Sequence, residues 1–273
     1  MDNCTLKNNQ AIGLTNQGGG IFNDGNMTIT NSHIESNFAG GGTNLGGGIN
    51  NQGNMTLTKS NLINNDLKGN SNLGGGIANQ EGGNTTANLN RIVGNTNPTI
   101  FKDKGNVNAE KNWWGTNHPD FKSLLLGMEN PKVWIYMTIK ADPAAIHPGE
   151  TSTIIVSFNQ IYNGTTITPL TGHIPDNTLV NFTSSLGEIG KIAHTIQGRA
   201  KTILKTSTTG IAIITAQTDQ QILSTRVKIN PKEDTNTSSH AQGTVGMENT
   251  GTEIMPIFLS IILIISGIFM NKD

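Results

Sequence analysis

The sequence predicts an all-β protein: a right-handed parallel β-helix with 28-residue turns, then a β-sandwich, then one C-terminal transmembrane helix. Three observations lead to this prediction. Nearly the same thirteen residues stand at 18–30 and 46–58, and a looser copy begins at Gly74, so the spacing is held at 28 residues. Strand-like runs separated by Pro, Gly and Asn follow Pro131. An apolar run without a charged residue lies near the C-terminus. A fixed repeat period of this length is typical of coiled or stacked architectures.

Each copy of the repeat predicts three short strands joined by three corners. In the segment NMTIT at 26–30, apolar residues alternate with Asn and Thr, which is the pattern of a half-buried strand. A second strand follows the Gly triplet, and a third lies near the end of each copy. Asn-Asp-Gly and Asn-Gln-Gly triplets supply the backbone angles of tight corners. The apolar residues that stay in column, and that we expect to form the core, are Ile21, Ile49 and Ile77, Met27 and Met55, and Ile34, Leu62 and Ile92.

One coil turn has a single apolar side that it cannot bury alone, so a continuous core requires stacked turns. Asparagines also stay in column at two corners, and stacked amides can hydrogen-bond along a column and pair the corner backbone groups. The abundance of Gly and Asn argues against a helical repeat. Cys4 aligns with Ser32 and Ser60, which predicts a small, partly buried position. The two expected columns are Asn23, Asn51 and Asn79, and Asn9, Asn37, Asn65 and Asn95.

The β-helix is expected to occupy residues 1–122. Trp113 and Trp114 would cover the open end of its apolar core, as capping units do in repeat proteins. The alternative is a sugar-stacking platform, because neighbouring residues of a strand point to opposite faces and one indole could stay exposed.

Residues 131–230 predict a β-sandwich, because several short alternating runs are separated by turn residues. Residues 231–253 have little aliphatic content and predict a disordered stalk. Residues 254–270 contain no ionisable side chain and follow a polar linker, so we expect a transmembrane helix rather than a buried core helix. Lys272 favours the C-terminal end inside and the preceding chain outside. No signal peptide is visible, so we expect that the chain lacks its true start and further coil turns.

The titratable residues do not form a recognisable site. The single cysteine excludes an internal disulfide framework and a Cys-based zinc site. Six histidines stand singly, and the net charge of −1 provides no field that would gather nucleic acid. A glycosidase needs paired carboxyls, yet no two acids of the repeats share a column. We therefore expect no catalytic residue, no metal, no cofactor and no enzyme activity. The acids of the repeats are Asp2, Asp24, Glu35, Asp66 and Glu81.

Three Asn-x-Thr triplets begin at Asn26, Asn54 and Asn84, which share one outward column of the repeat. Such triplets are acceptors for N-linked glycans in exported proteins. These three residues are therefore candidate glycosylation sites.

The elements at Ile34–Asn37, Leu62–Asn65 and Ile92–Asn95 resemble the repeats of chlamydial polymorphic membrane proteins. They resemble more closely the adhesin-like surface proteins of methanogenic archaea. The segment NWWGTNHPDF at 112–121 resembles the motif that ends the repeat array in that family. The segments IPDNTLVNFTSSLGEIG and TSTTGIAIITAQT resemble invasin-type Ig-like domains, with an unrelated β-sandwich as the alternative. The resemblance implies a repeat array, an Ig-like domain and a C-terminal membrane anchor.

These observations favour a single-pass cell-surface protein with its N-terminal part outside. We expect it to present a repetitive face to cells, glycans or another extracellular ligand through many weak contacts. The competing hypothesis is a structural envelope or spacer protein without a ligand. A β-helix of the polysaccharide lyase type is a remote third.

Overall fold

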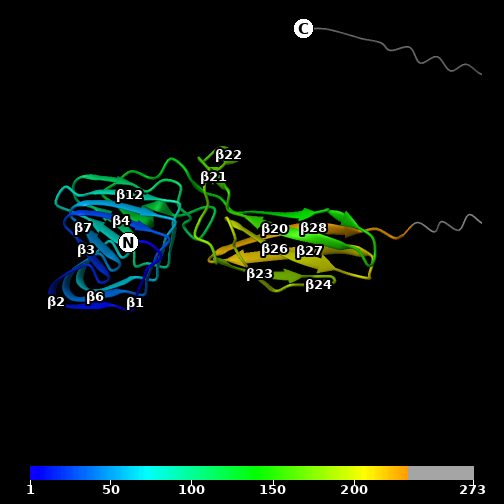
Figure 1. The fold of residues 1–273 in the computed structure, drawn as a ribbon, viewed down its shortest axis with the longest axis horizontal. Coiled ribbons are helices and arrows are strands. Elements are labelled where there is room, and N and C mark those ends of the chain that lie inside the picture. The colour runs from blue at the N-terminus through cyan, green and yellow to red at the C-terminus, as the bar shows by residue number, and fades with distance from the viewer. Residues whose placement is uncertain (233–273) are drawn as a thin grey trace, which may run out of the picture. The chain divides into compact units, whose positions relative to one another are not determined.

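Strands make up nearly all of the regular structure in the computed structural model, which describes residues 1–232 (Figure 1). The predicted transmembrane helix at 254–270 lies outside the described residues, as does the predicted stalk apart from its first two residues. The helix α1 (Phe121–Leu124) has one turn. Within residues 1–232, no helix has the length and apolar character that a membrane crossing requires.

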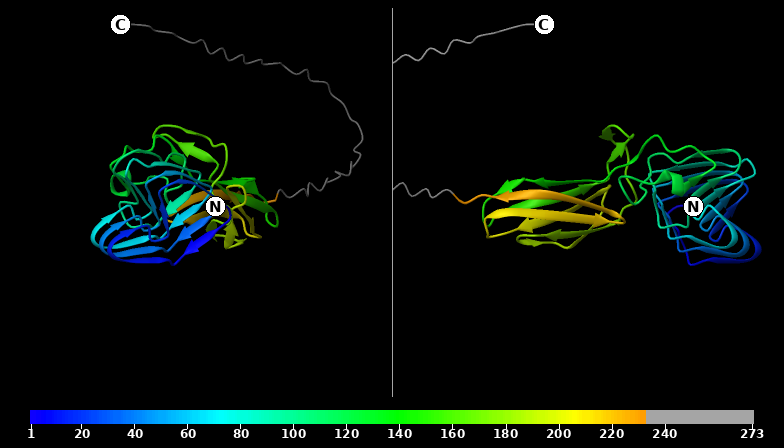
Figure 2. Two further views of the ribbon diagram at one scale, coloured as in Figure 1. Left: turned by 60° about the vertical axis from the view of Figure 1, so that its left-hand side comes forward. Right: turned by 180° about the vertical axis from the view of Figure 1, so that it is seen from behind.

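Residues 1–126, called the coil below, form a parallel β-solenoid of about four turns. Both views of Figure 2 show its strands stacked in rows. The right-handed sense of the coil stays a prediction. Four sheets run along the coil: sheet A with β4 (Asn26–Thr30), β8 (Asn54–Thr58), β12 (Asn84–Asn88) and β15 (Asn106–Asn108); sheet B with β1 (Thr5–Lys7), β5 (His33–Glu35), β9 (Asn61–Ile63) and β13 (Arg91–Val93); sheet C with β2 (Gln10–Gln17), β6 (Phe38–Leu45) and β10 (Asp66–Leu73); and sheet D with β3 (Ile21–Asn23), β7 (Ile49–Asn51), β11 (Ile77–Asn79), β14 (Ile100–Lys102) and β16 (Leu125–Leu126).

The prediction of three strands in each turn is wrong, because sheet C adds a fourth side to the coil. Its strands contain several Gly and Asn residues and lack the alternation that marks a half-buried strand. In β6, a Cβ added to Gly41 would lie 2.0 Å from the carbonyl oxygen of Gly13 in the preceding turn. Glycine therefore permits the close stacking of this side, and the same residues hide it from sequence patterns.

The predicted core residues lie in column along the coil. Ile49 pairs with Ile21 on one side and with Ile77 on the other, and all three are buried. Met27 pairs with Met55 in sheet A. Met55 is buried and Met27, in the first turn, is partly exposed. In sheet B, Ile34, Leu62 and Ile92 are likewise paired and buried. The apolar core of the coil is thus continuous from turn to turn.

Columns of bonded amides, called amide ladders below, run beside this core. Asn37 Nδ2 donates to Asn65 Oδ1 at 2.9 Å, and Asn65 Nδ2 donates to Asn95 Oδ1 at 2.9 Å. The backbone N–H of Asn37 also donates to Asn65 Oδ1. Asn65 Nδ2 donates in addition to the carbonyl oxygen of Ile34. Asn37 and Asn65 therefore bond to corner backbone groups as well as to the next amide of the ladder.

Three further columns complete this pattern. Asn23, Asn51 and Asn79 form the second predicted ladder, with Nδ2–Oδ1 distances of 2.7 and 3.0 Å. Sheet C carries a ladder that the sequence did not predict, formed by Asn16, Asn44 and Asn72. A last column continues from Cys4 through Ser32, Ser60 and Asn90 to Asn112, where each backbone N–H donates to the side chain one turn on.

The coil continues in register beyond the expected boundary at residue 122. Ile100 pairs with Ile77, and Leu125 pairs with Ile100. The last turns lack the long strand of sheet C, so the distance along the chain between paired residues falls below 28. No Gly triplet marks these strands, which is why the repeat pattern did not reveal them.

Residues 134–229 form two packed sheets with a small third sheet beside them, called the sandwich below. Its strands alternate buried and exposed residues, as in β20 and β26. The sheets are sheet F with β18 (Thr138–Asp142), β20 (Thr151–Ser157), β26 (Arg199–Lys205) and β24 (Glu188–Ile189); sheet G with β19 (Ala145–Ile146), β28 (Gln221–Ile229), β27 (Gly210–Thr218), β23 (Leu179–Ser184) and β25 (Ile192–His194); and sheet E with β17 (Trp134–Ile135), β21 (Gln160–Tyr162) and β22 (Ile167–Pro169).

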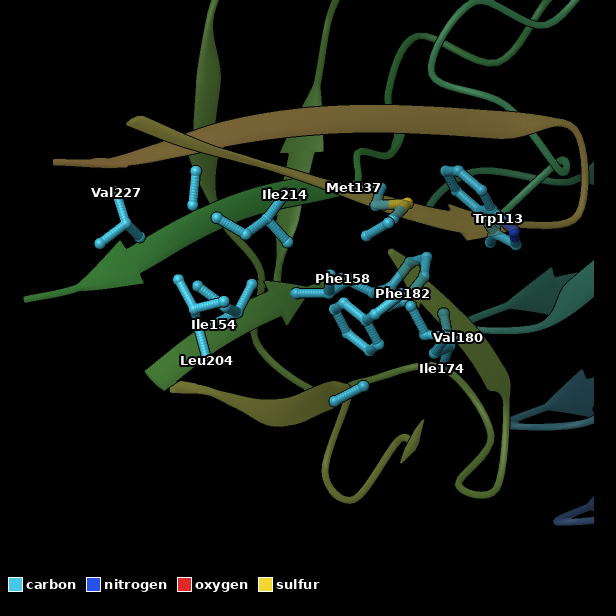
Figure 3. Packing of buried hydrophobic residues seen from close by; sticks show 14 of the residues in the cluster. Trp113, Met137, Ile154, Phe158, Ile174, Val180, Phe182, Leu204, Ile214 and Val227 are labelled. Carbon is cyan, nitrogen blue, oxygen red and sulfur yellow. The ribbon is translucent and has the colours of Figure 1, made fainter. Parts of the chain in front are cut away.

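Side chains of sheets F and G share one apolar core (Figure 3). Phe158 and Phe182 are fully or almost fully buried in it. Trp113 belongs to the same cluster although it precedes the sandwich in the chain, and its ring meets Phe158 edge-on at a centroid distance of 5.1 Å. Pairing within the sandwich is antiparallel except between β19 and β28.

Replacing Asn65 by Ala tests the amide ladders. The change removes the acceptor of two Asn37 donors in a fully buried position, so we expect the free energy of unfolding to fall by about 3 kcal/mol. Urea unfolding followed by circular dichroism measures it. Asn70→Ala, at an exposed position of β10, is the control and should change stability by less than about 0.5 kcal/mol. Equal effects of the two substitutions would contradict a structural role of the ladder.

Candidate functional site

The outward side chains of sheet A form a polar surface, called the Asn/Thr face below. The strands β4, β8 and β12 each begin with an outward Asn, followed two residues later by an outward Thr. The inward positions between them hold core residues such as Ile29 and Leu57, which fix the outward direction of the polar ones. Three columns cross the strands in register: Asn26, Asn54, Asn84 and Asn106; Thr28, Thr56, Thr86 and Asn108; and Thr30, Thr58 and Asn88.

The asparagine column of this face is itself a ladder, in the exposed surface. Asn54 Nδ2 donates to Asn26 Oδ1 at 2.9 Å, and Asn84 Nδ2 donates to Asn54 Oδ1 at 3.0 Å. Asn106 Nδ2 continues to Asn84 Oδ1 at 3.2 Å. Neighbouring strands of a sheet are about 4.8 Å apart, so amides and hydroxyls repeat at that spacing along the face.

A hollow of about 730 Å³ lies at the last strand of the Asn/Thr face. Residues Gly105–Glu110 line one side of it, and residues Gly127–Lys132 line the other. The N–H of Asn106 donates to Gly83 in the preceding turn. Backbone groups alternate in direction along a parallel strand, so those of Val107 face the open edge. Asn108, Glu110 and Lys132 line the hollow beside this edge. The hollow therefore offers hydrogen-bond donors and acceptors together with one acidic and one basic side chain.

Both tryptophans proposed as a sugar-stacking platform or end-cap are buried, Trp113 at 0% and Trp114 at 4% exposure. A platform needs an exposed indole face, so the stacking hypothesis for this pair is wrong. Trp114 lies in the core cluster of the coil, where it meets Phe121 edge-on. Trp113 lies in the core of the sandwich instead. The two indoles do point to opposite sides, as neighbours in a strand should, but each side is a separate apolar core.

A buried polar cluster joins the coil to the sandwich around Trp113. Asp219, at the hairpin between β27 and β28, has a side chain only 4% exposed. It accepts hydrogen bonds from Arg91 Nε at 3.0 Å and from Trp113 Nε1 at 2.7 Å, and it also pairs with the terminal guanidinium nitrogen of Arg91. The backbone N–H of Asn117 donates to Gln221 Oε1 at 2.7 Å, beside the same hairpin. We call Arg91, Trp113, Asn117, Asp219 and Gln221 the junction.

The acids and histidines of the described residues are dispersed. Glu35 pairs with Lys7 at 3.1 Å, and Asp66 accepts a hydrogen bond from Thr96. Hydrogen bonds from the Thr30 hydroxyl and the Asn31 amide hold the pKa of the Asp2 carboxyl below its ordinary value. Among residues 1–232, no three His, Cys, Asp or Glu side chains gather in a way that could hold a metal ion.

Sequence reasoning placed Asn26, Asn54 and Asn84 in one outward column and missed the rest of the site. Asn106 and Asn108 belong to the same columns, and the segment NVN could have revealed them, since it repeats the polar-apolar-polar start of NMT. Asp219 had no comparable signal. Its partner Arg91 stands 128 residues earlier in the chain, in an unrelated pattern.

No protein family and no curated protein matches the chain. Parts of solved structures are similar to it. The D0–D1 domain of intimin shares 22% identity over 34% of this chain and 46% of that chain, with a TM-score of 0.27. A 282-residue C-terminal fragment of intimin was solved with the intimin-binding domain of the translocated intimin receptor. It shares 22% identity over 34% of this chain and 32% of that chain, with a TM-score of 0.25. The adhesin InvE of Yersinia pseudotuberculosis shares 22% identity over 35% of this chain and 26% of that chain, with a TM-score of 0.26.

In each case the match covers less than half of the other chain. At TM-scores this low, the function has to be argued from the geometry of this chain itself.

The Asn/Thr face limits how many glycans one molecule can carry. Asn26, Asn54 and Asn84 are exposed, but neighbouring turns are only about 4.8 Å apart, which is less than the width of a sugar ring. In a host that N-glycosylates exported proteins, we expect no two neighbouring sites to be occupied on one molecule, so that only Asn26 and Asn84 can carry glycans together. Intact mass and glycopeptide mass spectrometry measure this. Three glycans on one folded chain would contradict the stacking.

Replacing Asp219 by Ala tests the junction. The change leaves the largely buried Arg91 guanidinium and the Trp113 indole N–H without an acceptor, so we expect stability to fall by about 3 kcal/mol. Thermal and urea unfolding measure it. Glu35→Ala breaks the exposed Lys7–Glu35 pair and should cost less than about 0.5 kcal/mol. If Asp219→Ala costs no more than this control, the junction does not hold the two parts together.

Proposed function

We propose that the protein is a cell-surface adhesin-like protein that presents the Asn/Thr face of its coil to cells or glycans. In this proposal it belongs with the adhesin-like surface proteins of methanogenic archaea that its repeats resemble, and its sandwich is an Ig-like spacer. Residues 254–270 anchor it as a single transmembrane span, with the preceding chain outside.

The in-register columns of the Asn/Thr face are the observation that carries the proposal. An exposed amide or hydroxyl gains little over its bonds to water, so a single contact on such a face is weak. Outward amides recur on β4, β8, β12 and β15, with outward hydroxyls on the first three, and such weak contacts add when they engage together. Amide ladders and a continuous core keep the turns stacked, which supports a rigid presenting surface.

A structural spacer without a ligand is the second candidate, and one observation favours it. The amides of Asn54, Asn84 and Asn106 already bond to one another on the face. Groups that satisfy each other offer less to a ligand than free groups do. The hydroxyls of Thr28, Thr56 and Thr86 do not bond to one another in this way. An adhesin would use these hydroxyls to bind its ligand, whereas a spacer would not need them.

We propose no enzymatic activity. A glycosidase would place two carboxyls across a cleft, and a lyase would place a base near clustered acids. The coil acids Glu35 and Asp66 have partners of their own, Lys7 and Thr96. Release of unsaturated sugars from polyuronates would overturn this part of the proposal.

Replacing Thr28, Thr56 and Thr86 together by Ala tests presentation. Protein from a bacterial host, which adds no glycan, is coupled to beads at high density and offered to partner cells and glycan surfaces. Beads carrying the natural face should adhere, and the monomer should bind barely, because avidity depends on the number of engaged copies. The triple substitution should reduce bead adhesion on the order of tenfold.

The control removes three hydroxyls from another side of the coil, with Thr15, Thr43 and Ser71 of sheet C replaced by Ala. These residues are exposed and in column like those of the Asn/Thr face. Adhesion that survives both triple substitutions equally would remove the Asn/Thr face from the mechanism. Indifference of natural beads to every surface tried would favour the spacer.

A further inference from the structure

A second hollow, of about 620 Å³, lies on the sandwich at the start of β26. Its lining contains two cations, Arg199 and Lys201, which stand two residues apart and both point outward from sheet F. Among the described residues, neither side chain has an ion-pair partner. The Asp176 carboxylate lies beside the hollow, where it accepts from the Gln197 N–H and stands 3.6 Å from His173 Nδ1. The charges of Arg199 and Lys201 are therefore left without a partner of their own.

The remaining lining residues add polar and apolar contacts. Gln197 and His173 supply hydrogen-bonding side chains, and Leu170 and Ile196 supply aliphatic surface. Ile196 is 71% exposed, so its aliphatic surface is open to a ligand at the rim of the hollow. Positive charge, amide groups and aliphatic surface together match a sugar ring that bears an acidic substituent.

The backbone around the hollow is held in place before any ligand arrives. Residues Gln197 and Gly198 both have positive φ, of 49° and 72°, and connect β25 to β26 in a tight turn. The N–H of Gln197 donates to Asp176 Oδ1 at 2.7 Å, and its carbonyl oxygen accepts from Asn159 Nδ2 at 3.0 Å. The N–H of Leu170 donates to the carbonyl oxygen of Asn159 at 3.0 Å. A site fixed in this way loses little conformational entropy on binding.

We propose that this hollow binds an acidic saccharide, with Arg199 and Lys201 receiving its carboxylate or sulfate group. Arginine matches a planar carboxylate with two parallel N–H donors, and lysine adds a compact charge. A volume of about 620 Å³ lies within the range of small-molecule sites and accommodates a short oligosaccharide. The site is distinct from the Asn/Thr face, so it is a second point of attachment rather than part of the first.

Binding of oligogalacturonate to the full chain, held in a non-ionic detergent, tests the proposal by isothermal titration calorimetry. The methyl-esterified oligomer keeps the backbone and loses the charge, and should bind at least about tenfold more weakly. Arg199→Gln with Lys201→Gln should lower the affinity for the acidic oligomer by about tenfold or more. The exchange Arg199→Lys with Lys201→Arg keeps the charge and should retain most of the binding.

The matched control is Arg226→Gln with Lys228→Gln, which removes the same charge from the exposed positions of β28 in sheet G. This variant should bind within about twofold of the natural protein, since distant exposed charges are largely screened at physiological salt. An equal loss in both double variants would reduce the effect to general attraction and overturn the proposal. Absence of binding, or preference for an acidic peptide of the same charge, would overturn it as well.

The saccharide site and the proposed function can be refuted separately. The triple substitution at Thr28, Thr56 and Thr86 leaves the hollow intact, so oligogalacturonate binding should be unchanged in that variant. Loss of bead adhesion together with retained oligogalacturonate binding separates the two sites. Loss of oligogalacturonate binding in that variant would overturn the assignment to the sandwich.

Discussion

The structure depends on the fact that no turn of the coil can satisfy its own buried groups. Asn65 accepts two hydrogen bonds from Asn37 and donates onward to Asn95, so its amide is complete only between two neighbours. Ile49 is buried for the same reason, between Ile21 and Ile77. Loss of one turn exposes apolar surface and orphans buried amides together. Stability is therefore a property of neighbouring pairs, as in other stacked repeats.

Much of the coil could be predicted because its repeat keeps apolar residues and asparagines in column. Sheet C could not, since Gly41 and its neighbours carry no alternating pattern, and their role is to let backbones approach. The end of the array was also hidden, because Ile100 and Leu125 continue the column of Ile77 without a Gly triplet. Sequence patterns show which residues repeat. They do not show where glycine lets two backbones approach, or where a turn of the coil is shorter than the others.

The site was predictable only in part, for a different physical reason. The outward column of Asn26, Asn54 and Asn84 follows from strand periodicity within one repeat. The opposite directions of Trp113 and Trp114 follow from the same rule, but the rule cannot say that a second core receives Trp113. Asp219 lies far along the chain from Arg91, and the hollow around Arg199 is assembled from several loops. Contacts between residues of unrelated sequence patterns become visible only in the folded structure.

The junction hairpin has a mechanical consequence. A pull on the chain at Asn230 enters β28, whose ladders with β27 and β19 take tension as shear along many parallel bonds. At the far end of β28, the turn at Asp219 is bonded to Arg91 and Trp113, so the tension passes into the first residues of β13 and the last turn of the coil. There, sheet pairing and amide ladders share the load among several hydrogen bonds at once. Under such a pull, these bonds would yield by collective rupture rather than one at a time.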